Sequence, residues 1–308
     1  MKHLSWMVER VVTLQLNEQN ECGDSMIKCC KESAIDACGV SNPEGLVYNV
    51  QSNVTYAKFA EFPWTVVILQ RDISLYVPDL TIIAGGALIH PKFVLTAAHA
   101  LKDTHRYLAR FGEWNLRSSA EIYPRQDIHI EEFIIYPSYR DNILPVYDVA
   151  LGVLRENVVY SEHIRPLCLP NAQDVFEGQR CIESGWGLDV RTGQPPTVMK
   201  RMELKVISRI ECQLLYQLAE ANSNFRLHRN VMCATALENQ NAFIRDGGTP
   251  LACQRADGSY ALAGITAWGG YNGQTYLPIA YTDVAKFASW INGMIDVYDE
   301  ENKGQLPG

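Results

Sequence analysis

The 308-residue sequence predicts an all-β fold that ends in one amphipathic helix. From residue 65 onward, short runs of branched and aromatic residues alternate with Gly, Pro, Asn and Asp, which is typical of strands joined by turns. Near the C-terminus, apolar residues recur at spacings of three and four, which predicts a helix over residues 284–297. Together these patterns favour a β-barrel or β-sandwich that the helix closes.

The expected strands are many and short, and turns separate them. Examples are residues 66–69, 86–89, 93–96, 107–111, 149–154, 202–206 and 261–268. The first 50 residues differ from the rest, because they carry four of the nine cysteines and little sustained periodicity. We therefore divide the chain into an N-terminal segment (1–37), a linker (38–50), a main domain (51–298) and a polar tail (299–308).

Composition and charge exclude several classes of function. The net charge of −8 argues against nucleic acid or an anionic membrane surface as the main partner. No apolar run reaches the 18 or so residues that a membrane span requires. Nine cysteines favour an oxidising, extracellular location, and Asn53 begins a glycosylation triplet that fits secretion. Residues 1–16 are not predicted to be a signal peptide, because Glu9 and Arg10 interrupt the apolar stretch.

Three positions, in chain order, carry the chemistry of interest. His99 ends a short apolar strand, Asp148 begins another, and Gly247 lies in the glycine-rich stretch DGGTPL at residues 246–251. Taken singly, a His or Asp beside a strand is more often a satisfied polar residue than a catalyst. Their order and spacing make a functional constellation the better interpretation.

With the motifs around them, these residues resemble the chymotrypsin-like serine protease family over about residues 38–298. The motifs are EFPW (61–64), GGALI (85–89), LTAAH (95–99), RPLCLP (165–170), CIESGWG (181–187), AWG (267–269) and AYTDV (280–284). The resemblance implies a double β-barrel with a C-terminal helix. It also matches His99 to the general base and Asp148 to the acid that orients it.

The resemblance implies an inactive protein, because Gly247 stands where the family has its nucleophilic serine. Glycine has no side chain that could attack a carbonyl, and Thr249, two residues on, is expected to point elsewhere. The oxyanion loop is altered as well: Arg245 takes a glycine position, and Asp246 and Gly248 complete that loop.

The implied substrate pocket and activation site also depart from the family pattern. The pocket would consist of Asn241, where trypsin-like enzymes keep a carboxylate, and residues Ala267, Trp268 and Gly269. The activation site would fall near residues 51–54, after Val50, where a trypsin-like activator does not cut. Asp246 would then lack the buried ammonium that orders active members of the family, with Arg245 as a candidate partner.

The family's cysteine pattern implies three disulfides here. They are Cys38–Cys168, Cys181–Cys253 and Cys212–Cys233. Two further family bridges are lost in pairs, at Ala84 with Ala100 and at Phe243 with Asn272. No cofactor or metal site is implied. Glu113 and Glu121 lie in a loop where relatives sometimes bind calcium, and we expect them to be solvated acids instead.

The remaining cysteines, Cys22, Cys29 and Cys30, resemble the end of an arthropod clip domain, so residues 1–37 form a truncated clip-like segment or a disordered leader. The chain thus resembles clip-domain serine protease homologues, which implies a secreted, non-catalytic cofactor in prophenoloxidase activation and melanisation. Its implied partners are prophenoloxidase or its activating protease. Two alternatives stay open: an active serine endopeptidase, and a protein that recognises microbial surfaces.

Overall fold

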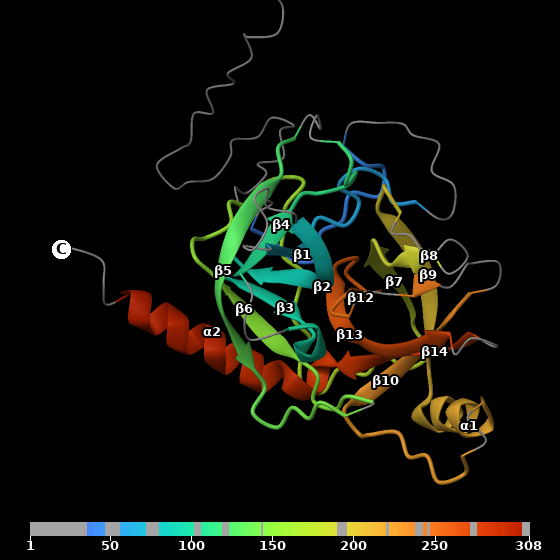
Figure 1. Ribbon diagram of the computed structural model, residues 1–308. Helices are drawn as coiled ribbons and strands as arrows, with labels where there is room; N and C mark the ends of the chain where they lie inside the picture. The colour runs from blue at the N-terminus through green and yellow to red at the C-terminus, as the bar shows by residue number, and fades with distance from the viewer. Residues whose placement is uncertain are drawn as a thin grey trace, which may run out of the picture. The chain divides into compact units, whose positions relative to one another are not determined.

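Two six-stranded antiparallel barrels make up the body of the protein (Figure 1). The structure, a computed structural model, describes residues 36–46, 56–71, 80–101, 106–118, 123–142, 144–189, 196–219, 222–237, 243–244, 247–271 and 276–303. The calls on Asn53, Glu121, Asn241, Arg245, Asp246 and the three N-terminal cysteines lie outside these residues.

The first barrel closes in the order β1-β2-β3-β6-β5-β4. Its strands are β1 (Thr65–Arg71), β2 (Leu80–His90), β3 (Phe93–Thr96), β4 (Arg106–Phe111), β5 (Gln126–Ile135) and β6 (Ala150–Leu154). The second closes in the order β10-β14-β13-β12-β7-β9. Its strands are β7 (Arg180–Gly185), β9 (Lys200–Ile207), β10 (Val231–Ala236), β12 (Pro250–Gln254), β13 (Tyr260–Tyr271) and β14 (Tyr276–Asp283). A small sheet pairs β8 (Leu188–Asp189) with β11 (Phe243–Ile244).

The predicted all-β fold is therefore confirmed, and each strand named from the sequence lies in one of these elements, except that β6 begins at Ala150, one residue later than expected. Closure explains the composition of the strands, because a closed barrel leaves no open edge and fills its interior with alternate side chains. In β9, for example, residues 200, 202, 204 and 206 are buried. The residues between them, at 201, 203 and 205, are more exposed. One hydrophobic core continues from the first barrel into the second and includes Trp64, Leu95, Ile265 and Ile291.

The C-terminal helix differs in detail from its prediction. A 3₁₀ turn (Val284–Phe287) comes first, and α2 then runs over Ala288–Lys303, past the predicted end at residue 297. Tyr298 explains the extension, because its ring packs edge-on against Phe93 with centroids 5.3 Å apart. The Lys92 ammonium also lies 5.5 Å from the centre of the Tyr298 ring.

A second helix, α1 (Arg209–Ala219), was not predicted and packs on the second barrel. Its signals are local: Ser208 accepts a hydrogen bond from the Glu211 N–H at 3.1 Å, an N-cap, and Cys212 and Tyr216 form the buried face. None of the helices in the described residues is long and apolar enough to cross a bilayer.

Candidate functional site

His99 and Asp148 meet because their strands are neighbours in the first barrel. His99 lies in a 3₁₀ turn (Ala98–Ala100) just after β3, and Asp148 comes just before β6. Since β3 pairs with β6, with Thr96 opposite Ala150, the end of one strand lies beside the start of the other. The His99 Nδ1 atom is 2.6 Å from Asp148 Oδ2, and the His99 backbone N–H donates to Oδ1 at 2.9 Å.

The surroundings hold Asp148 in place on both sides. Asp148 is fully buried, and its backbone carbonyl accepts a hydrogen bond from the Thr282 hydroxyl at 2.7 Å. Tyr147, just before it, adopts a positive φ of 55°, a backbone conformation that residues other than glycine seldom take. The Tyr147 ring stacks on Tyr136 with centroids 5.8 Å apart, which supports that turn.

The charge of Asp148 changes the protonation of His99. Burial alone lowers the pKa of the imidazole, but the hydrogen bond and negative charge of Asp148, with a smaller effect from Asp141, raise that pKa above its usual value. In this pair Nδ1 donates to the carboxylate, so Nε2 is left to face Gly247.

Gly247 lies directly against the imidazole. A Cβ atom added to Gly247 would overlap Cε1 and Nε2 of His99 and would lie 3.3 Å from Nδ1. The ring therefore occupies the volume that the β-carbon of any other residue would need. The backbone here is fixed, because the Gly85 N–H donates to the Gly247 carbonyl at 3.0 Å and the Gly248 N–H donates to Thr266 at 2.9 Å.

Thr249 follows Gly247 by two residues and packs against Gly85. Its side chain is buried, and an added Cβ on Gly85 would lie 2.6 Å from the Thr249 hydroxyl oxygen. Its carbonyl accepts hydrogen bonds from the N–H of Thr266 at 2.9 Å and from the Thr266 hydroxyl at 3.1 Å. The hydroxyl thus lies close to the backbone of Gly85.

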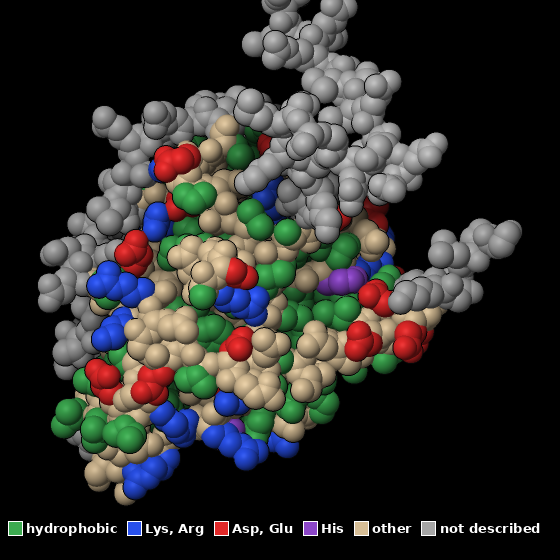
Figure 2. Space-filling view, turned by 180° about the vertical axis from the view of Figure 1, so that it is seen from behind, with side chains coloured by type: hydrophobic (Ala, Val, Ile, Leu, Met, Phe, Trp, Pro, Cys, Tyr) green, Lys and Arg blue, Asp and Glu red, His purple; other side chains and the backbone are tan. Residues whose placement is uncertain are grey.

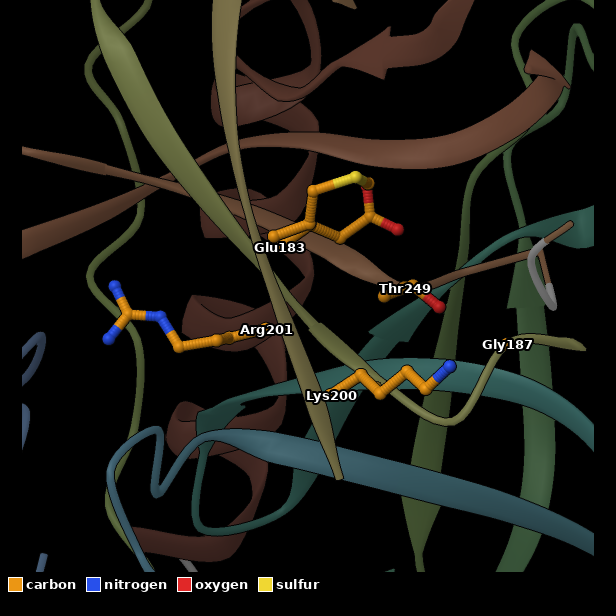
Figure 3. A pocket seen from close by; sticks show the side chains of 7 residues that line it. Glu183, Gly187, Lys200, Arg201 and Thr249 are labelled. Carbon is orange, nitrogen blue, oxygen red and sulfur yellow. The ribbon is translucent and has the colours of Figure 1, made fainter. Parts of the chain in front are cut away.

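Next to Thr249 is a pocket between β7, β9 and β12 (Figure 3). The Lys200 side chain extends to the same side as the Thr249 hydroxyl, whereas the Arg201 guanidinium points the opposite way. Arg201 pairs with Glu61 and Glu203, at 2.5 and 3.1 Å. Lys200 was missed by the sequence reasoning, although a lysine in phase with the buried Met202 and Leu204 is a readable signal.

The AWG motif lies in β13, beneath α1. The Trp268 ring packs edge-on against Tyr216, with centroids 5.0 Å apart. Gly269 has a φ of +97°, and its missing side chain leaves room for the Tyr216 hydroxyl, which donates to the Pro278 carbonyl at 2.6 Å. Ala267, before Trp268, is buried and offers no hydroxyl.

The described residues contain three disulfides, with the pairing that the resemblance implied. They join Cys38 to Cys168, Cys181 to Cys253, and Cys212 to Cys233. The first fixes the segment around residue 38 to the main domain. The third fixes α1 to β10.

The expectation of a solvated Glu113 is wrong. Glu113 is buried, and its Oε2 lies 3.0 Å from Arg125 and 3.4 Å from Arg110. Arg110 also binds both oxygens of Asp127, at 2.7 Å each. The sequence did not predict this burial, because the ion pairs of Glu113 with Arg110 and Arg125 were not expected. Within the described residues, no group of three His, Cys, Asp or Glu side chains is placed to hold a metal ion.

Comparison with known proteins settles the family. Residues 52–291 match the family model described as trypsin. The chain belongs to the trypsin family. Within this family it is 41% identical to the inactive CLIP domain-containing serine protease A8 of Anopheles gambiae, over 94% of this chain and 83% of that protein. The solved structure of GrC superposes with a TM-score of 0.64 at 26% identity, over 79% of this chain and 98% of GrC.

Two further insect relatives span most of the chain. The inactive CLIP domain-containing serine protease A28 of Anopheles gambiae is 35% identical over 91% of this chain and 79% of its own length. Phenoloxidase-activating factor 2 of Galleria mellonella is 33% identical over 86% of this chain and 91% of its own length. This trypsin-family chain is thus similar to insect proteins that are named either inactive proteases or phenoloxidase-activating factors.

Proposed function

We propose that this chain is a non-catalytic serine protease homologue, in which Gly247 replaces the nucleophilic serine. The observation that carries this proposal is the contact between Gly247 and the His99 ring. The imidazole retains its carboxylate partner, yet Gly247 in front of it has no side-chain hydroxyl, and the imidazole fills the space that a serine β-carbon would take.

A protein that keeps this scaffold without the nucleophile can still bind other proteins through the loops at the rim of its barrels. We propose that it acts as a cofactor or scaffold in an extracellular immune protease cascade, in which prophenoloxidase or its activating protease is the partner. The names of the relatives support this role, since one is a phenoloxidase-activating factor. The three disulfides support an oxidising, extracellular location.

Reconstitution from purified components tests this role. Prophenoloxidase and its activating protease are combined with and without the chain, and an unrelated acidic protein at equal concentration serves as the control. We expect the chain, and not the control, to change the phenoloxidase output. Equal output in both samples would remove the cofactor role.

A further inference from the structure

The outer face of α1 carries an unusual row of exposed apolar side chains. Ile210, Leu214 and Leu218 follow one another at intervals of four residues and are 73%, 51% and 77% exposed. Leu215 adds a fourth large apolar side chain at 37% exposure. We call these four residues the α1 stripe. A surface helix normally directs polar residues outward, and a contiguous apolar patch on a soluble protein commonly marks an interaction site.

The packing of α1 does not account for the stripe, because the opposite face of the helix fastens it to the barrel. Cys212 is fully buried and forms its disulfide with Cys233 in β10. Tyr216 is buried and reaches Pro278 and Trp268 in the neighbouring strands. The stripe is thus held in one orientation by a covalent bond and a buried side chain, so a partner would meet a preformed surface.

Positive charge adjoins the stripe on a chain whose net charge is −8. The exposed residues Arg209, Arg226 and Arg229 lie at the start of α1 and in the following loop, and residues 222–230 contain no Asp or Glu. Arg209 donates to the carbonyl oxygens of Leu227 and His228, and Arg226 donates to two carbonyls of its own loop. In the described part of the chain, none of the three arginines forms an ion pair with a carboxylate. Figure 2 shows hydrophobic side chains at the lower left, where α1 lies, with basic side chains on one side of them and acidic side chains above them.

We propose that the α1 stripe and its three arginines form a docking surface for an amphipathic helix of a partner protein, with leucine-like residues on one side and Asp or Glu beside them. Apolar contact provides the affinity, and the arginines select an acidic partner. A second copy of this chain fits poorly, because pairing two α1 stripes would bring the same arginines together.

Fluorescence anisotropy with two synthetic peptides tests the proposal without any cascade component, so the outcome is independent of the proposed cofactor role. Each peptide has about 18 residues, or five helical turns, with leucines along one side. The remaining positions are rich in Glu in one peptide and in Lys in the other. We expect the intact protein to bind the Glu peptide at least about tenfold more tightly than the Lys peptide.

Three variants test whether the peptide binds at the α1 stripe. Leu218→Asp should weaken binding of the Glu peptide at least about tenfold, and Arg226→Glu combined with Arg229→Glu should reverse the preference between the peptides. Val297→Asp is the matched control, because Val297 is an exposed apolar residue, at 52%, on the other long helix. It should bind like the unmodified protein. Equal binding of both peptides, unchanged binding by Leu218→Asp, or no binding of the Glu peptide by the unmodified protein would each overturn the proposal.

Discussion

The His99 ring occupies the volume in which a side chain at residue 247 would lie. The imidazole is drawn in one direction by Asp148, through a 2.6 Å contact, and its opposite edge lies against the bare backbone of Gly247. The geometry that keeps the histidine paired with its acid therefore also closes the position in front of it. A β-carbon at residue 247 therefore requires the His99 ring to shift.

We expect Gly247→Ser to leave the protein unable to hydrolyse a chromogenic peptide. The new β-carbon would displace the His99 ring, and inserting atoms into a packed site should lower the free energy of unfolding by about 1–3 kcal/mol. Gly293→Ser is the control, since no atom lies within 4 Å of its added Cβ. It should change the free energy of unfolding by no more than about 0.5 kcal/mol in chemical denaturation. Peptide turnover by Gly247→Ser would show that the ring moves aside freely.

The raised pKa of His99 gives a second prediction. A histidine whose pKa is raised by folding contributes stability in full below about pH 6.5, and loses that contribution as the pH rises through the folded-state value. His99→Ala should therefore lower the free energy of unfolding more near about pH 6 than near about pH 9.

Titration of the imidazole resonances by NMR measures the pKa directly. That of His99 should lie above about 6.5, and Asp148→Asn should lower it. His163 is the internal control, because burial lowers its pKa and its partners are Ser161 and the Pro124 carbonyl. A His99 that titrates at or below the ordinary value would contradict the ion pair.

The helix α1 shows how a single cap and a buried face shape an element. Ser208 satisfies the N–H of Glu211, and Cys212 and Tyr216 hold the inner side against the barrel. Ser208→Ala should lower the free energy of unfolding by about 1 kcal/mol, while Ser208→Asp should preserve it. Thermal or chemical denaturation of the two variants compares them. An equal decrease in the free energy of unfolding of both variants would mean that the side-chain oxygen at residue 208 does not stabilise the helix.

The elements that the sequence predicted are those with strong local patterns. Residues 93–96 are a run of aromatic and branched residues and residues 261–268 are a mostly apolar run, so their strands were predictable, and so was the helical spacing after Val284. The helix α1 was missed because its outer residues, such as Ile210 and Leu218, are apolar and blur the amphipathic pattern. The burial of Glu113 was missed because Arg125, one of its two arginine partners, is brought to it by the pairing of β4 with β5.

The candidate site was predicted in part. The residue types at 99, 148 and 247 follow from the sequence, and the meeting of His99 with Asp148 follows from the pairing of β3 with β6. The overlap of the His99 ring with the side-chain position of Gly247 could not be predicted, because it depends on side-chain placement to within an ångström. The same holds for the placement of Lys200 in one pocket with Thr249.

At the scale of the whole molecule, two disulfides close chain segments of very different length. Cys38–Cys168 closes a sequence separation of 130 residues, and Cys212–Cys233 closes one of 21. If chain entropy dominates, replacing the first pair by serine should cost about 1–2 kcal/mol more unfolding free energy than replacing the second. Chemical denaturation of the two double variants measures that difference. A larger loss for Cys212–Cys233 would mean that local packing around α1 outweighs loop closure.

Reaction with a fluorophosphonate probe tests the central claim most directly, because the probe bonds covalently only to an activated serine or a similarly activated hydroxyl. The folded protein and an active trypsin-family enzyme are treated side by side, and the probe is detected by intact mass spectrometry. We expect the enzyme to be labelled and this chain to remain unmodified, since Gly247 offers the imidazole nothing to activate. A stoichiometric adduct on this chain would contradict the account and identify the chain as an enzyme.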